Sequence, residues 1–177
     1  MNSDRFWSLI EQSRNGFRPD RADGNMDRQL GTMQDLLAEL PPEEVKAFDD
    51  LLHSRLVEAY TWDVWGAATL LAGGSCSDDS FTDFCSWLVS LGRQSFEQAI
   101  ADPDSLAVLA FAPGVEDIFF EEFQYVAAEV FEEMTGEAIE DYSESYPDDP
   151  KGTKRWNSPE DLKQIYPKIQ AAMQAKK

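Results

Sequence analysis

Three aspartates and a tryptophan lie close together in the middle of the chain and could bind a cation. Asp79 and Asp83 are four residues apart, and Trp87 follows after another four. In a helix this spacing places all three side chains on one face. Two carboxylates beside an aromatic ring can hold a guanidinium, an ammonium or a metal ion, with the ring as a cation–π wall. Together with Asp78, they form a predicted carboxylate/Trp pocket.

The segment from Gly73 to Asp79, which contains the first two of these aspartates, also has an interpretation that requires no ligand. Gly73 and Gly74 can adopt positive φ and end a helix, and Ser75 or Ser77 can cap the next one. Asp78 then falls in the first turn, where the helix dipole favours negative charge by about 0.3–1 kcal/mol. The end of one helix, a turn and the acidic first turn of the next helix therefore explain the segment up to Asp79.

The Asp79 and Asp83 carboxylates can also be neutralised within the fold. Like charges four residues apart on a helix repel each other, so a nearby cation is expected. Buried carboxylates usually find that cation in their own chain, and we favour such internal pairing. The candidate partners are Arg28, Arg55 and Arg93. Whether the pair is functional or internally paired stays open from the sequence.

Three further side chains are candidates for the same pocket: Trp65, Glu122 and Tyr125. Other chemical templates are not matched. The chain has one histidine, His53, so a site with two histidine ligands is excluded. We assign no metal ligands, and the sequence leaves any cofactor unknown. Phosphate-binding glycine loops and calcium-loop patterns are also lacking. Cys76 and Cys85, with no C-x-x-C spacing, are interpreted as free thiols of a cytoplasmic protein.

The charge of the chain is strongly negative and unevenly distributed. The formal net charge is −19, and residues 94–150 hold 16 acidic residues and no Lys or Arg. A field of this sign repels phosphate backbones, so nucleic-acid binding is not expected. A basic protein is a possible partner, although acidity can also serve solubility alone. Residues 151–177 are basic, and this tail could fold back onto the acidic region.

The hydrophobic periodicity is helical almost throughout and predicts an all-α protein. We expect a single domain over residues 1–177, a bundle of about seven or eight helices. No run of apolar residues is long enough for a membrane span, and no signal-peptide pattern begins the chain. Ser3 is the expected N-cap of the first helix. The main helices are expected at residues 4–13, 25–40, 41–60, 62–72, 78–91, 94–100, 115–134 and 158–177.

A long acidic loop is expected at residues 137–157, where prolines, serines and acids replace the apolar pattern. Trp156, beside two basic residues, is interpreted as the side chain that pins this loop down. Ser158 then precedes a proline and is followed three residues later by Asp161, which is a capping-box pattern. The C-terminal helix is therefore expected to start here and to continue to residue 177.

The segment from Trp62 to Ala107 resembles a bacterial family catalogued as a domain of unknown function, number 4240. The resemblance is carried by WDVWGAATLLAGG, CSDDSFTDFCSWLVSLGR, SFEQAI and DPDSLA. FWSLIEQSR, EEFQYVAAEVFEEMTG and RWNSPEDLKQIYPKI extend it over most of the chain. Ser75 is an extra residue relative to the family pattern. The resemblance implies a helical domain of an actinobacterial-type cytoplasmic protein and carries no activity to transfer.

Two functional hypotheses follow. The first is a non-enzymatic binding or regulatory protein, immunity-like or accessory, that uses its acidic surface against a basic protein partner. The second is a protein or enzyme that binds a small molecule or metal in the carboxylate/Trp pocket at Asp78, Asp79, Asp83 and Trp87. The first predicts a contiguous acidic face on the helix around residues 115–134, and the second predicts carboxylates that converge on a cavity.

Overall fold

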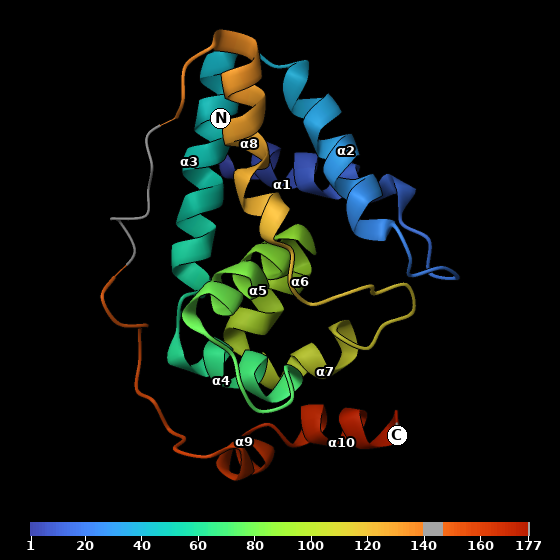
Figure 1. The fold of residues 1–177 in the computed structure, drawn as a ribbon, viewed down its shortest axis with the longest axis vertical. Helices are drawn as coiled ribbons and strands as arrows, with labels where there is room; N and C mark the ends of the chain where they lie inside the picture. The colour runs from blue at the N-terminus through green and yellow to red at the C-terminus, as the bar shows by residue number, and fades with distance from the viewer. Residues whose placement is uncertain (140–146, 177) are drawn as a thin grey trace.

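The protein is all-α, as the computed structural model shows for residues 1–139 and 147–176. Within these residues the regular elements are helices, and the one β-bridge is an isolated contact between Thr61 and Lys151. The chain forms a single helical domain (Figure 1). The described α-helices are α1 (Ser3–Ser13), α2 (Asn25–Ala38), α3 (Pro42–Ala59), α4 (Trp62–Leu71), α5 (Asp78–Ser90), α6 (Arg93–Ala101), α7 (Leu106–Leu109), α8 (Glu121–Thr135), α9 (Pro159–Ile165) and α10 (Pro167–Ala175).

Local capping residues determine where several helices begin. The Ser77 side chain accepts a hydrogen bond from the Ser80 N–H at 3.2 Å, and Ser158 forms the expected capping box with Asp161. The prediction for the first helix is wrong by one residue. Asn2, rather than Ser3, caps α1, because its Oδ1 accepts from the Arg5 N–H at 2.9 Å.

Helix α8 begins at Glu121, which corrects the expected start at residue 115. Contacts with other elements hold the preceding segment in a non-helical form. The Phe120 N–H donates to the backbone carbonyl of Asp83 at 3.1 Å. The Glu116 carboxylate accepts from the N–H groups of Gly24 and Met26 at the start of α2, both at 3.2 Å. These tertiary hydrogen bonds replace those of another helical turn.

The C-terminal segment forms two helices where one was expected. Pro167 has no N–H and disfavours helical backbone at Tyr166, whose φ is −119° and ψ 67°. The buried carboxylate of Asp104 then caps the second helix, accepting from the N–H groups of Lys168 and Ile169 at 3.0 Å each. This break, together with the short helix α7, raises the number of described helices above the expected seven or eight.

The basic tail folds back onto the acidic region, as expected from the charge distribution. Lys168 forms an ion pair with Asp102 at 2.7 Å, and the Lys176 ammonium lies 4.7 Å from the Phe111 ring centroid. Residues 147–157 run over the surface, and Lys151 exchanges backbone hydrogen bonds with residues on either side of Thr61. The rest of the expected acidic loop, residues 140–146, lies outside the described residues.

Helix α8 lies against α2, α3 and α5 and completes the upper part of the bundle, whereas α9 and α10 cross below α4 and α7 (Figure 1). Most of α4 is buried, including Gly66 and Ala67. No helix among residues 1–139 and 147–176 is long and apolar enough to cross a membrane. The largest fully buried side chains are Phe6, Ile10, Met33, Leu37, Phe48, Leu52, Phe81, Phe84, Leu88, Phe96, Leu106 and Phe123.

Candidate functional site

Asp79 and Asp83 lie on one side of α5, near the start of α8. Asp79 is exposed and Asp83 is half-buried, and Asp83 Oδ1 accepts a hydrogen bond from Gln124 Nε2 at 3.2 Å. Among the described residues, no Lys or Arg lies within ion-pair distance of either carboxylate. The two aspartates therefore lack the internal cation that the sequence led us to favour.

The three arginines proposed as internal partners are engaged elsewhere. Arg93 pairs with Asp4 at 2.8 Å, and Arg55 pairs with Glu58 on its own helix. Arg28 donates to the Asn25 side chain at 2.7 Å and to the backbone carbonyl of Asp23. Each arginine has found a partner closer in sequence or on α1, so the predicted internal pairing is wrong.

Further carboxylates surround Asp83. Burial raises the pKa of Asp83, and Glu121, Asp79 and Glu122 raise it further by repulsion, while the hydrogen bond from Gln124 opposes the shift. This grouping does not make a metal site. Within the described parts of the chain, no three His, Cys, Asp or Glu side chains come together as metal ligands.

Asp78 has a different environment from the other two aspartates. Its Oδ1 accepts a hydrogen bond from the Tyr60 hydroxyl at 2.7 Å. Burial raises the Tyr60 pKa, and this hydrogen bond to a carboxylate raises it further. The Tyr60 ring in turn packs against Phe81, with 5.5 Å between ring centroids. Asp78 thus anchors a core tyrosine.

Trp65 belongs to an aromatic cluster on α4 and α5. Its ring stacks on Phe81 at 4.6 Å and on Trp62 at 5.4 Å between centroids, and its indole N–H donates to the Cys76 carbonyl. Trp62 also contacts Trp156 from the C-terminal segment, edge to face at 6.4 Å. The interpretation of Trp156 as an anchor for the loop agrees with this contact.

Trp87 is not a wall of the carboxylate pocket. Its side chain is 3% exposed and packs against Phe84, with 5.2 Å between ring centroids. It lines a cavity to which Asp78, Asp79 and Asp83 do not contribute. The predicted pocket is therefore divided: Asp78 holds Tyr60, Asp83 contacts α8, Asp79 is exposed, and the tryptophan lines a separate cavity.

Glu122 and Tyr125 lie on the solvent side of α8. Tyr125 is 48% exposed, and Glu121, Glu122 and Glu129 around it are exposed as well. Spacings of three and four residues continue this side to Glu132 and Glu133. The contiguous acidic side that the sequence predicts for this helix is present.

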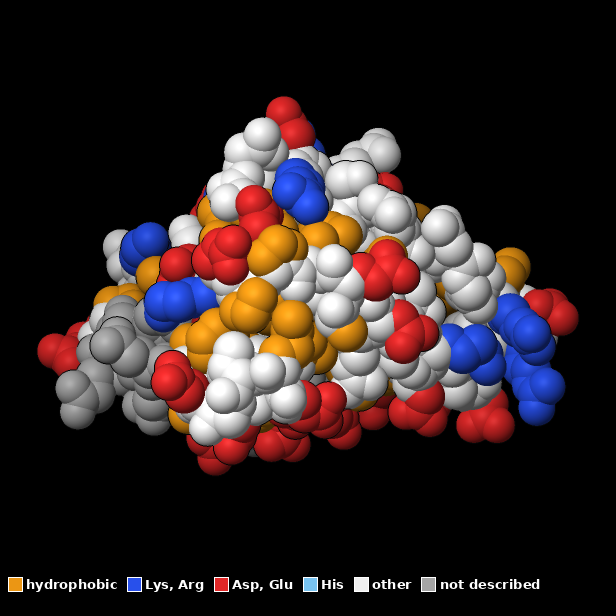
Figure 2. Space-filling model, turned by 90° about the horizontal axis from the view of Figure 1, so that it is seen from above, with side chains coloured by type: hydrophobic (Ala, Val, Ile, Leu, Met, Phe, Trp, Pro, Cys, Tyr) orange, Lys and Arg blue, Asp and Glu red, His pale blue; other side chains and the backbone are white. Residues whose placement is uncertain are grey.

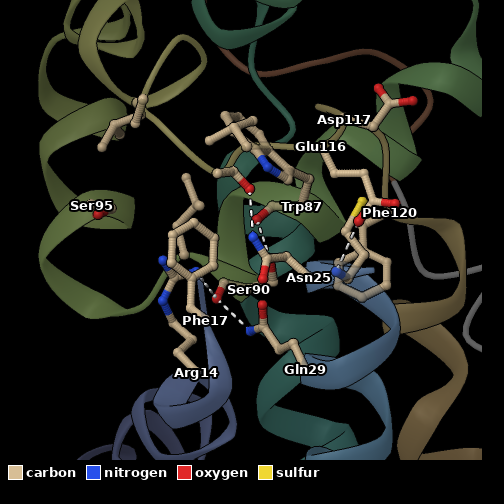
Figure 3. Close-up of a pocket in the computed structure, with 16 residues that line it drawn as sticks. Arg14, Phe17, Asn25, Gln29, Trp87, Ser90, Ser95, Glu116, Asp117 and Phe120 are labelled. Atoms are coloured by element: carbon tan, nitrogen blue, oxygen red, sulfur yellow. Dashed lines mark hydrogen bonds between the residues drawn. The ribbon is translucent and has the colours of Figure 1, made fainter. Parts of the chain in front are cut away.

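The cavity lined by Trp87 has a volume of about 120 Å³ and is partly open to solvent (Figure 3). Its walls are mainly apolar, and they come from segments far apart in the sequence. The lining residues are Arg14 and Phe17 after α1; Asn25, Met26 and Gln29 on α2; Trp87, Ser90 and Leu91 at the end of α5; Ser95 on α6; Leu109 on α7; and Ala112, residues 114–117 and Phe120 before α8.

The polar groups around the cavity differ in how fully they are engaged. Gln29 Nε2 donates to the Ser90 carbonyl at 2.8 Å, and Asn25 Nδ2 donates to the Gly114 carbonyl at 2.8 Å. Arg14 Nη1 also donates to the Ser90 carbonyl, at 3.1 Å, while its guanidinium lies over the Phe17 ring. Burial lowers the Arg14 pKa, and the charge of Glu11 partly offsets this. The amides are thus structural, whereas the arginine is a desolvated cation.

Apart from Trp87, the residues that line this cavity were not singled out in the sequence as a site. A family model described as a protein of unknown function, DUF4240, matches residues 1–133 of the 177. The chain belongs to the DUF4240 family. The DUF4240 match includes the cavity, Asp79, Asp83 and nearly all of α8, but it stops before RWNSPEDLKQIYPKI, which the resemblance had included. No curated protein and no solved structure matches the chain significantly.

Proposed function

We propose that this DUF4240 protein is a non-enzymatic binding or regulatory protein that binds a basic protein partner through an acidic face. The acidic face consists of Asp79, Asp83, Glu121, Glu122, Glu129, Glu132 and Glu133. These residues come from the start of α5 and the solvent side of α8. An accessory or immunity-like role in the cytoplasm fits this mode of binding, and the two free cysteines suit a reducing compartment.

The observation that carries the proposal is the lack of compensating charge. Each described ion pair of the chain involves carboxylates outside the acidic face, such as Asp4, Glu44 and Asp63. Burial raises the Asp83 pKa, and repulsion from carboxylates of the face raises it further. A basic partner would relieve this repulsion, and complementary potentials of this kind increase association rates and favour the correct partner.

Exposed apolar surface beside these carboxylates supports a partner that is amphipathic as well as basic. Tyr125 is 48% exposed within the face, and Met134, at the end of α8, is 40% exposed. Figure 2 looks onto the end of the bundle where α8 ends and α3 begins: hydrophobic side chains gather in its middle, and Asp and Glu side chains line its lower edge. Tyrosine surrounded by charged residues is a common centre of protein interfaces.

A direct test uses a fluorescein-labelled amphipathic helical peptide of Lys and Leu as the probe. The triple variant Glu129→Gln, Glu132→Gln, Glu133→Gln removes three charges from the acidic face. Each exposed charge pair contributes about 0.2–1 kcal/mol, so the peptide should bind roughly three- to a hundredfold more weakly in fluorescence anisotropy. Added salt should also weaken the binding of the peptide to the wild-type protein, because it screens these charges.

A matched control separates the acidic face from net charge. The variant Asp20→Asn, Asp23→Asn, Asp27→Asn also removes three charges, but from the connection before α2 and from the first turn of that helix. It should bind the peptide nearly as well as wild type. Equal weakening by both triple variants, or binding that salt does not change, would contradict the proposal.

A further inference from the structure

We propose that the cavity between Trp87 and Arg14 binds a small, flat organic monoanion, an aromatic carboxylate of one ring. This site is separate from the acidic face and takes a ligand of the opposite charge. It rests on three observations: the size and apolar walls of the cavity, an arginine at one end that forms no ion pair with the described residues, and carboxylates at the other end.

The volume and the walls fit a single ring. A cavity of about 120 Å³ is comparable with the roughly 150 Å³ that holds benzene in a protein interior. Trp87, Phe120 and Phe17 provide aromatic surface, and Leu109 and Leu91 provide aliphatic surface. Aromatic side chains favour stacked or edge-on contacts with another ring, so a planar apolar group suits these walls.

Arg14 supplies the anion-binding end. It is half-buried, and among the described residues no carboxylate lies within ion-pair distance of its guanidinium, although the chain carries 34 acidic residues. One of its nitrogens, Nη1, donates to the Ser90 carbonyl. A guanidinium has five N–H donors, so further donors are available for a carboxylate, which it can bind in a bidentate manner. Ser95 lies on the same side of the cavity and adds a hydroxyl (Figure 3).

The opposite end of the cavity limits the charge of the ligand. Glu116 and Asp117 lie away from Arg14 in Figure 3. The Glu116 carboxylate accepts hydrogen bonds from the N–H groups of Gly24 and Met26, which fix its position. A ligand with a second negative charge on its far side would meet these carboxylates. The site should therefore select monoanions over dianions.

The experiment measures binding of four probes to the full-length chain by titration calorimetry and ligand-observed NMR. Benzoate is the expected ligand; benzyl alcohol, benzylammonium and terephthalate have the same ring with no charge, a positive charge and two negative charges. Benzoate should bind at least about tenfold more tightly than each of the others, because only it pairs with the arginine without facing a carboxylate. The net charge of −19 alone would favour benzylammonium, so the expected order is opposite to that of nonspecific attraction.

Two variants locate the site. Arg14→Gln should weaken benzoate binding by about tenfold or more, and Ala112→Leu, which fills the cavity, should abolish it. Arg93→Gln is the matched control, because Arg93 is also half-buried but pairs with Asp4 outside the cavity, and it should change affinity by less than about twofold. No preference for benzoate in the wild-type protein, or unchanged affinity in Arg14→Gln, would overturn the proposal. Because the probe comparison needs only wild type, it decides the matter even if a variant does not fold.

Discussion

Replacing Gly66 with alanine tests how the C-terminal segment docks on α4. A β-carbon at this position would lie 2.7 Å from Trp156 Nε1 and 2.7 Å from the Tyr166 hydroxyl oxygen. Both distances are below van der Waals contact, so one or both rings must move. The Tyr166 hydroxyl donates to the Asp63 carbonyl at 2.7 Å, and that hydrogen bond would be strained or lost.

The expected change in the free energy of unfolding is the sum of two opposing effects, steric overpacking and helix propensity. Overpacking a buried site destabilises by about 1–3 kcal/mol, and loss of a hydrogen bond adds about 1 kcal/mol. Alanine in a helix interior is favoured over glycine by roughly 0.5–1 kcal/mol. The steric effect is the larger, so Gly66→Ala should lower the free energy of unfolding by about 1–3 kcal/mol.

Gly31→Ala is the matched control. Gly31 also lies inside a helix, α2, but no atom would come within 4 Å of its new β-carbon. It should therefore gain only the helix-propensity effect, about 0.5–1 kcal/mol. Urea unfolding of the two variants measures both changes, and thermal unfolding should show opposite shifts of roughly 2–4 °C per kcal/mol. If both variants gain stability equally, Trp156 and Tyr166 do not pack against α4 as described.

Two further substitutions have expected outcomes of defined sign. Burial, with repulsion from Asp50, raises the Asp49 pKa to about 6, while Lys46 opposes this. Because the native state holds the Asp49 proton more tightly than the unfolded state does, protonation of Asp49 stabilises the fold fully below the unfolded pKa near 4, and this stabilisation is lost as pH rises through 6. Asp49→Asn should therefore raise the free energy of unfolding by up to about 3 kcal/mol at pH 7 and by much less at pH 4. Urea unfolding at both pH values measures the difference. An equal effect of Asp49→Asn at both pH values would contradict the raised pKa. Lys154→Met keeps an apolar side chain of similar length but removes the ammonium that lies 4.2 Å from the Trp156 ring centroid. It should lower the free energy of unfolding by about 0.5–1 kcal/mol and change the tryptophan fluorescence. If neither quantity changes, the ammonium does not contact the ring.

The helical fold was predictable because most of its signals are local. Ser77 and the Ser158 capping box mark helix starts within one turn of sequence, and the apolar stripe of α8 has the right period. The start of α8 was not predictable, because a backbone hydrogen bond from Phe120 to the distant Asp83 ends the preceding segment. Such a contact leaves no pattern in the residues around it.

The candidate site was predictable only in part for the same reason. Helical spacing correctly placed Asp79 and Asp83 on one side of α5, but it could not show that Arg93 would pair with Asp4 on α1. Spacing also placed Trp87 with them, although tertiary packing buries it. The cavity beside Arg14 is assembled from two distant segments, residues 14–29 and 87–120, so no single stretch of sequence predicts it.

The docking of α9 and α10 has a consequence for where this protein can be divided. The family match ends at residue 133, yet Leu162 and Ile169 beyond it are fully buried, and Tyr166 is nearly so. The family match therefore ends before the last residues that complete the hydrophobic core. A fragment that ends at residue 133 would leave α4 uncovered, and the shortest piece of this chain that folds as described extends into α10.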